Sequence, residues 1–206
     1  MSYWWVMEDD SLYVKQVQAG NAEAFGVLYD RYLDKIYRFI YYKTFNKETA
    51  EDLTSEVFHK ALLKISSFDI DKGSFSTWLY QIARNRVIDY YRTAKSVVPL
   101  EDVFDIGVDE RTPETLDAVA KLGEVTEYLK TLSAKQREII TLRVWEEKSY
   151  REIAELIGGS EDSVKMAYSR SIKELREKCG PTSLALLFIA CGSLSEISWL
   201  PFSDFS

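Results

Sequence analysis

The chain has 206 residues, of which 46% are hydrophobic and 29% charged, and it carries a formal net charge of −7. These proportions are ordinary for a globular protein and exclude global disorder, and the length allows one medium domain or two small ones. Glycine and proline are scarce, with nine and four residues, and there are two cysteines and one histidine without a CxxC pair. We therefore expect an all-α protein that holds no structural zinc and no other cofactor.

Four helices are expected in the first half of the chain, over residues 11–20, 22–42, 47–66 and 75–92. In the second of them, apolar residues recur every three or four positions, which is typical of a helix with one buried face. The third is expected to bury Ala50, Leu53, Val57, Ala61, Leu62 and Ile65. Its expected outer side chains are Asp52, Ser55, Glu56, His59 and Lys60.

The helix expected over residues 75–92, FSTWLYQIARNRVIDYYR, has two chemically distinct faces. Its apolar face consists of Phe75, Trp78, Leu79, Ile82, Ala83, Val87 and Tyr90. Its polar face consists of Gln81, Arg84, Asn85, Asp89 and Arg92. Arginine and asparagine can bond base edges, and arginine and glutamine can bond phosphate oxygens. The polar face therefore predicts contact with nucleic acid, and an ordinary solvated surface is the alternative.

Residues 96–115 differ from their surroundings in composition. They include Pro99 and Pro113 and have no sustained helical period, and the stretch 96–122 holds seven acidic and two basic residues. We interpret 96–115 as a flexible acidic linker between two small helical domains, at 10–95 and 116–178. Twenty extended residues span at most about 70 Å, which is enough for two domains to reach DNA sites many base pairs apart.

The second domain contains clear helix start and stop signals. Capping boxes at residues 133–136 and 149–152 start two helices, a glycine pair at 158–159 ends the latter, and Ser160 is the expected N-cap of one more. That last helix is expected to bury Val164, Ala167, Tyr168, Ser171, Ile172 and Leu175. Its expected outer side chains are Asp162, Lys165, Met166, Ser169, Arg170 and Lys173. Two helices joined by a short glycine turn indicate a helix-turn-helix, and a plain helical hairpin is the alternative.

The two ends of the chain carry weaker signals. A hydrophobic run at 184–190 lies within the C-terminal extension 179–206 and is too short to span a bilayer. Docking on the second domain, binding a partner and disorder all stay open for it. Cys179 and Cys191 are expected to be reduced thiols. The opening residues MSYWWVMEDD lack the basic flank and long apolar run of a signal peptide, so we expect a cytoplasmic protein.

Several motifs in a fixed order give the chain a resemblance to extracytoplasmic-function (ECF) sigma factors, from about Asp10 to Lys178. The first half is similar through AFGVLYDRYLDKIYRFI, AEDLTSEVFHKAL and FSTWLYQIARNRVIDYYR, and the second through LSAKQREIITLRVWEEKSYREIAELIGGSEDSVKMAYSR. The resemblance implies a non-catalytic subunit that binds RNA polymerase core and promoter DNA and has no small-molecule substrate. An anti-sigma factor is a further partner that is common in the family.

The resemblance also implies roles for particular residues. The segment matching DLTSEVF docks on the polymerase clamp helices in the family, which implies contacts by Asp52, Ser55, Glu56 and Phe58. The following loop forms a pocket for a flipped-out base, which implies Phe68, Lys72 and Ser74, with a simple interhelical loop as the alternative. The first domain's promoter contacts then continue through Gln81, Arg84, Asn85, Asp89 and Arg92. Those of the helix-turn-helix are Ser160, Asp162, Ser163, Lys165, Met166, Ser169, Arg170 and Lys173.

The chain departs from the family pattern at a few positions. The family usually has Leu-Pro where this chain has residues 132–133, an apolar residue at Gly159, and more arginine where this chain has Ala167 and Ile172. We expect the fold to tolerate these departures, but they leave the bases that are read undefined. A stand-alone helix-turn-helix regulator and a helical interaction protein without DNA contact are the alternatives. The regulator leaves the segments 50–62 and 75–92 unexplained.

Overall fold

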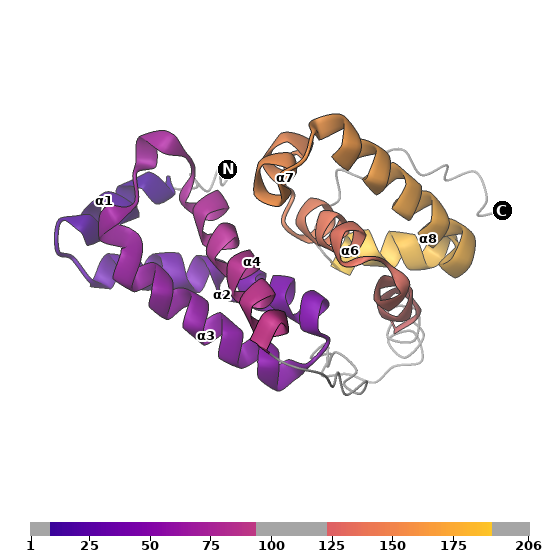
Figure 1. Cartoon of the computed structure of the whole chain (residues 1–206), viewed down its shortest axis with the longest axis horizontal. Coiled ribbons are helices and arrows are strands. Elements are labelled where there is room, and N and C mark those ends of the chain that lie inside the picture. Colours follow the sequence, from indigo (N-terminus) through magenta and orange to yellow (C-terminus); the bar gives the residue numbers. More distant parts are fainter. Residues whose placement is uncertain (1–8, 94–122, 191–206) are drawn as a thin grey trace, which may run out of the picture. The chain divides into compact units, whose positions relative to one another are not determined.

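The computed structural model describes residues 9–93 and 123–190 (Figure 1). The chain divides into two units, Met1–Leu100 and Glu101–Ser206. Every regular element within the described ranges is helical, and no strand occurs in them. The all-α class is therefore confirmed, together with the division into two helical domains. The linker expected over 96–115 lies outside the described residues.

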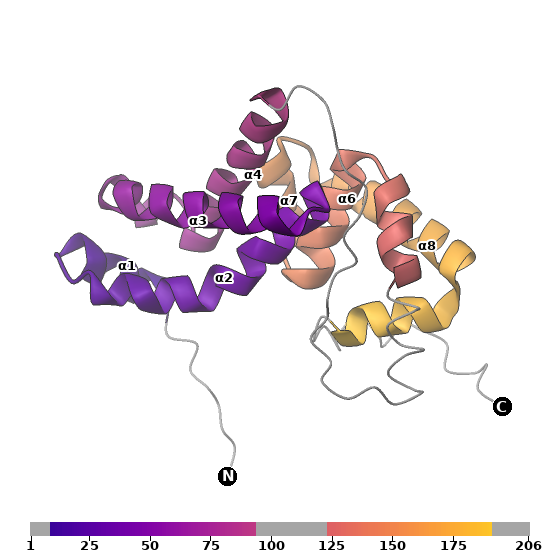
Figure 2. The ribbon, with the colours of Figure 1, turned by 90° about the horizontal axis from the view of Figure 1, so that it is seen from below.

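The first unit is a cluster of four helices. They are α1 (Asp10–Gln18), α2 (Glu23–Thr44), α3 (Lys47–Lys64) and α4 (Phe75–Thr93), with 3-10 turns η1 (Ile65–Ser67) and η2 (Ile70–Lys72) before α4. All four were expected, and their ends differ from the expected ones by no more than two residues. α2 and α3 lie side by side in both views (Figures 1 and 2). The chain reverses between them at Phe45, whose φ is 48°, and the Asn46 side chain caps α3 by accepting a hydrogen bond from the Thr49 N–H at 2.7 Å.

Aromatic side chains fill much of the core of the first unit. Phe39 and Tyr80 pack edge to face with their ring centroids 5.3 Å apart, and this pair joins α2 to α4. The expected inner face of α4 is buried except at Trp78 and Tyr90, which are half-buried. The expectation that Leu62 is buried is wrong, because its side chain is 44% exposed. Its neighbour Ala61 is fully buried, and successive residues of a helix point about 100° apart.

The second unit is built from shorter helices. They are a helix over residues 123–131, α6 (Ala134–Ile140), a π-helical turn η3 (Thr141–Trp145), α7 (Tyr150–Ile157) and α8 (Glu161–Ala190). Both capping boxes are formed, at residues 133–136 and 149–152, as expected. The helix that begins with the first box was expected to continue to Val144 as an α-helix, but it changes to π-helical geometry at Thr141.

A glycine turn joins α7 to α8. Gly158 adopts left-handed backbone angles (φ 70°, ψ 53°), and the N–H groups of Gly158 and Gly159 both donate to the Ala154 carbonyl. The Ser160 hydroxyl accepts a hydrogen bond from the Ser163 N–H at 3.3 Å, so the expected N-cap is formed. The inner face of α8 is buried at Val164, Tyr168, Ser171, Ile172 and Leu175, and Ala167 is half-buried. The helix-turn-helix therefore has its expected local structure.

α8 changes direction near its end, where Gly180 has non-helical angles (φ 78°, ψ 167°). Figure 2 shows the part of α8 coloured yellow running in a different direction from the orange part. Pro181–Ala190 is helical, so part of the C-terminal extension forms a helix. Its docking on the second domain stays a prediction. Within the described residues, none of the helices combines the length and apolar character needed to cross a membrane.

Candidate nucleic-acid and partner interfaces

The outer side of α3 carries three of the four residues expected to bind a partner. Asp52, Ser55 and Glu56 are exposed, and we call them the docking face. Phe58 is 3% exposed and packs on Tyr29 of α2, with ring centroids 4.7 Å apart. Phe58 is therefore corrected from a surface contact to a core residue, because it lies on the buried side of α3.

One residue of the docking face, Glu56, forms an ion pair that joins α3 to α4. The Arg86 guanidinium of α4 donates a hydrogen bond from Nε to the Glu56 carboxylate. This hydrogen bond, together with the positive charge of Arg86, lowers the pKa of Glu56. Glu56 is still half exposed, so a partner can reach its carboxylate while it is paired with Arg86.

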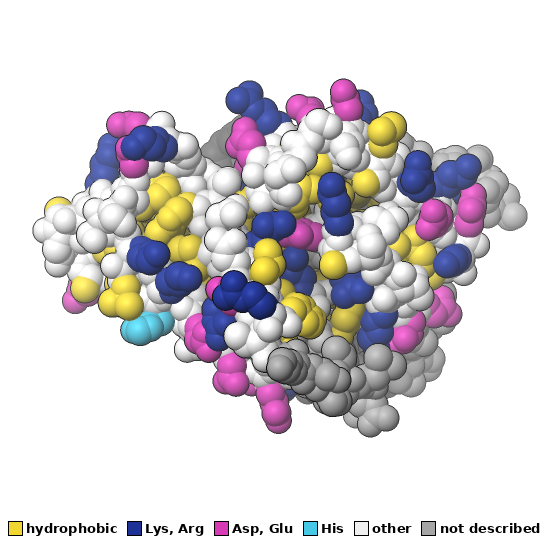
Figure 3. All heavy atoms as spheres, in the orientation of Figure 1, with side chains coloured by type: hydrophobic (Ala, Val, Ile, Leu, Met, Phe, Trp, Pro, Cys, Tyr) yellow, Lys and Arg dark blue, Asp and Glu magenta, His cyan; other side chains and the backbone are white. Residues whose placement is uncertain are grey.

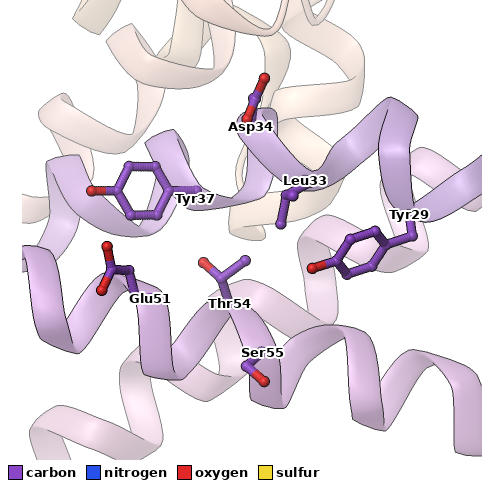
Figure 4. Close-up of a pocket in the computed structure, with 7 residues that line it drawn as sticks. All are labelled: Tyr29, Leu33, Asp34, Tyr37, Glu51, Thr54 and Ser55. Carbon is purple, nitrogen blue, oxygen red and sulfur yellow. The ribbon is translucent and has the colours of Figure 1, made fainter. Parts of the chain in front are cut away.

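A groove of about 290 Å³ runs between α2 and α3 beside the docking face. It is lined by Tyr29, Leu33, Asp34, Tyr37, Glu51, Thr54 and Ser55 (Figure 4). Figure 4 shows the rings of Tyr37 and Tyr29 towards its two ends, with Thr54 between them. The Thr54 hydroxyl is not available to a ligand as a donor, because it donates to the Ala50 carbonyl at 2.6 Å. Two carboxylates, Asp34 and Glu51, give the groove an acidic rim.

The loop between α3 and α4 is held by local contacts. The Phe68 ring packs on Trp78 at 4.9 Å, and the Phe68 carbonyl accepts a hydrogen bond from Gln18 Nε2 at 2.7 Å. Lys72 forms an ion pair with Asp69. The Ser74 hydroxyl caps α4 by accepting a hydrogen bond from the N–H of the residue three positions later. Phe68, Lys72 and Ser74 thus each have a different partner, and their shared role in a base pocket stays a prediction.

The polar face of α4, which we call the α4 stripe, has Gln81, Arg84, Asn85, Asp89 and Arg92 in line. Asn85 and Arg92 are exposed, and the other three are half-buried. Arg92 forms an ion pair with Asp89 at 3.1 Å, so Asp89 orients the guanidinium of the last turn. The stripe presents amide and guanidinium donors in a row that matches the spacing expected from the sequence.

The outer side of α8 is polar with one exception. We call the set Asp162, Lys165, Met166, Ser169, Arg170 and Lys173 the recognition face, and all six are exposed. Ser160 is exposed and Ser163 half-buried, and these two form the cap described above. On the buried side of α8, opposite the recognition face, the Tyr128 hydroxyl donates a hydrogen bond to the Ser171 carbonyl at 3.0 Å.

Charge is mixed on the face seen in Figure 3, where Lys and Arg side chains are interspersed with Asp and Glu. Among the described residues, no group of three or more His, Cys, Asp and Glu side chains could hold a metal ion. A net charge of −7 gives the free chain weak non-specific attraction to DNA phosphates, so specific contacts have to dominate any DNA binding by the free chain.

Comparison with known proteins identifies both units. Residues 28–97 match Sigma-70 region 2, and residues 122–175 match Sigma-70, region 4. The chain is 35% identical over 178 residues to the ECF RNA polymerase sigma factor SigW of Bacillus subtilis, covering 80% of this chain and 94% of SigW. The chain belongs to the ECF family of RNA polymerase sigma factors. It is also 37% identical over 166 residues to the ECF sigma factor BldN of Streptomyces coelicolor, covering 79% of this chain and 62% of BldN.

Solved structures share the fold of this sigma factor. The structure of CnrH in complex with the cytosolic domain of CnrY matches with a TM-score of 0.59, covering 88% of this chain and 97% of CnrH at 24% identity. The sigma factor RpoE, in complex with the anti-sigma factor NepR from Bartonella quintana, matches with a TM-score of 0.60, covering 76% and 96% at 24% identity. Because sigma factors bind RNA polymerase, membership of this family favours a polymerase-binding subunit over a stand-alone regulator. Sigma factors are regulatory rather than catalytic proteins.

Proposed function

We propose that this ECF sigma factor binds RNA polymerase core and directs it to a class of promoters. The observation that carries the proposal is that matches to regions 2 and 4 occur in that order on two separate helical units. A stand-alone regulator needs only the second unit to bind an operator. The stand-alone alternative therefore does not explain the exposed acidic face on α3 or the row of hydrogen-bond donors on α4.

The docking face is the proposed contact with polymerase core. Asp52 and Glu56 lie four residues apart and therefore project from the same side of α3. Two carboxylates at this spacing suit a cationic surface on the partner. The acidic rim of the neighbouring groove, at Asp34 and Glu51, extends the same charge.

The two units have different proposed roles on the promoter. The α4 stripe contacts the nearer promoter element and helps to melt it, with the loop at residues 68–74 receiving a flipped base. The recognition face of α8 reads the upstream element in the major groove, as the second helix of a helix-turn-helix does. A protein with this role needs no catalytic residue, cofactor or small-molecule substrate, and acts in the cytoplasm, where the chromosome is.

An anti-sigma factor is a further proposed partner. Support comes from RpoE of Bartonella quintana, a structural relative that was solved in complex with one. Such a partner would compete with polymerase core if it covered the docking face.

A reconstitution tests the proposal. The full-length chain is mixed with bacterial core polymerase, and the mixture is analysed by gel filtration and by transcription from a promoter library. We expect co-elution with core and transcription that depends on the added chain. Binding to a DNA fragment without core, combined with no co-elution, would instead support the stand-alone regulator. Neither activity would support the helical interaction protein.

A further inference from the structure

One apolar side chain interrupts the polar outer side of α8. Met166 is 65% exposed, and among the residues described in 123–180 it is the only large hydrophobic side chain that is exposed. Single exposed hydrophobic residues are common on protein surfaces, so exposure alone assigns no role to Met166. Its position on the helix and its neighbours provide the rest of the argument.

Met166 lies in the second turn of α8 after the N-cap at Ser160. Asp162 four residues before it and Arg170 four residues after it project from the same side of the helix, and Ser169 is beside them. All of these side chains are exposed. The N-terminal part of the second helix is the part of a helix-turn-helix that contacts base edges. Met166 therefore stands among the side chains that are placed to read bases.

The chemistry of methionine limits what it can read. Its thioether has no hydrogen to donate and is a weak acceptor, so it cannot use the donor and acceptor pattern of the major groove well. The one apolar group that a standard base pair presents there is the C5-methyl group of thymine. A flexible, polarisable methionine side chain can adapt its shape to such a group.

We propose that Met166 contacts the C5-methyl group of a thymine in the upstream promoter element and so selects an A·T pair at one position. This inference rests on the proposed function of the second unit, and it adds the kind of base that one residue reads. Burying one methyl group changes an equilibrium by roughly fourfold, and this sets the size of the expected effect.

Deoxyuridine provides a direct test, because it differs from thymidine only by the missing methyl group. The holoenzyme of the full-length chain and core polymerase first selects promoters from a pool with a randomised upstream element. Each thymine of the selected element, on either strand, is then replaced singly by deoxyuridine. At one position we expect wild-type binding to fall roughly fourfold, and Met166→Ala to bind both DNAs equally and as weakly as wild type binds the deoxyuridine form.

Lys165→Ala is the matched control on the adjacent exposed residue. Loss of this cation should weaken binding to both DNAs by the same factor and preserve the fourfold effect of deoxyuridine. Circular dichroism checks that the helices are intact in both variants. The inference is overturned if the selected element contains no thymine, or if Met166→Ala keeps the wild-type sensitivity to deoxyuridine.

Two further outcomes separate this inference from the function on which it rests. If Met166→Ala weakens promoter use without changing sensitivity at any thymine, Met166 contacts a protein and not a base, and the inference is wrong. If Met166→Ala, Lys165→Ala and Arg170→Ala all leave use of the upstream element unchanged, the second unit does not read DNA through α8. The proposed role of this unit then fails together with the inference.

Discussion

Arg86 of α4 is paired with Glu56 of α3, thirty residues earlier in the chain. This pair joins the helix of the docking face to the helix of the α4 stripe. Glu56 therefore has a structural partner as well as a proposed one, and variants of Glu56 change two interactions at once. The two effects can be separated by measuring stability and polymerase binding independently.

The first prediction concerns the stability that the pair provides. Both side chains are partly exposed, so Glu56→Gln should lower the free energy of unfolding at pH 7 by no more than about 1 kcal/mol. Because Arg86 lowers the pKa of Glu56, the contribution is present above the unfolded-state pKa of about 4.3 and is lost as the pH falls through the folded-state pKa. Thermal unfolding by circular dichroism from pH 7 to pH 3 should show the wild type and the variant converging. A difference that stays constant with pH would exclude the ion pair as its source.

The second prediction concerns docking. Reversing both charges with Asp52→Arg and Glu56→Arg should weaken binding to core polymerase at least roughly tenfold, since two favourable contacts become repulsive. The control Glu127→Arg with Glu155→Arg makes the same change in net charge on the second unit, where both carboxylates are exposed. Binding is measured by titrating labelled protein with core. Equal losses in both double variants would mean that net charge, and not this surface, governs binding.

A charge swap distinguishes the two roles of Glu56. Glu56→Arg combined with Arg86→Glu reverses the ion pair but preserves attraction between α3 and α4. If Glu56 contacts the polymerase, binding should stay weak in the swap while stability recovers. Full recovery of core binding would assign Glu56 a purely structural role.

Local signals account for most of what the sequence predicts correctly. The capping boxes at residues 133–136 and 149–152, the glycine turn and the buried face of α8 all depend on residues a few positions apart. Spacing along one helix also predicts the α4 stripe. The spacing of apolar residues fails to predict burial at the boundary between the exposed and the buried side of a helix. Phe58 follows the exposed Ser55 and Glu56 but lies three residues before buried Ala61, and it packs with the core.

Contacts between distant segments could not be predicted in the same way. Nothing in the sequence pairs Arg86 with Glu56, and nothing pairs Gln18 of α1 with the Phe68 carbonyl. Such contacts depend on how α1, α3 and α4 pack, and one sequence holds no direct information on that packing. The change to π-helical geometry at Thr141 was missed for a similar reason, since no proline or glycine marks it.

The third prediction concerns the support under the recognition face. Tyr128→Phe removes the hydrogen bond to the Ser171 carbonyl and should cost about 1 kcal/mol at neutral pH. Burial, and then the nearby Glu174 carboxylate, raises the pKa of Tyr128 to about 12. The protonated phenol is therefore favoured in the folded state, and its contribution is complete below pH 10 and is lost as the pH rises towards 12.

Denaturant unfolding of wild type and Tyr128→Phe between pH 8 and pH 12 measures this effect. Other groups that titrate in this range affect both proteins, so the difference between the two isolates Tyr128. The difference should shrink at the alkaline end. A difference that grows with pH would have the wrong sign for a buried neutral phenol.

The fourth prediction concerns promoter melting. Asn85→Ala and Arg92→Ala remove exposed donors from the α4 stripe, so transcription from a duplex promoter should fall. A template with a pre-melted bubble should partly restore activity to any variant whose defect lies in strand opening. Lys64→Ala, an exposed cation at the end of α3, is the control and should transcribe both templates normally. Normal activity of both stripe variants on duplex DNA would make the stripe an ordinary solvated surface.

The last prediction concerns Arg170 on the recognition face. A guanidinium can bond two acceptors of one guanine in the major groove, and such a contact provides about 1–3 kcal/mol of discrimination. Arg170→Ala should therefore weaken use of the upstream element roughly tenfold while core binding stays normal. Scanning the element base by base distinguishes two ways of producing this loss. A guanine contact relaxes the preference at one position, whereas a phosphate contact weakens all sequences alike and reduces the salt dependence of binding. Unchanged dependence on the upstream element would place the DNA-reading side of α8 elsewhere than at Arg170.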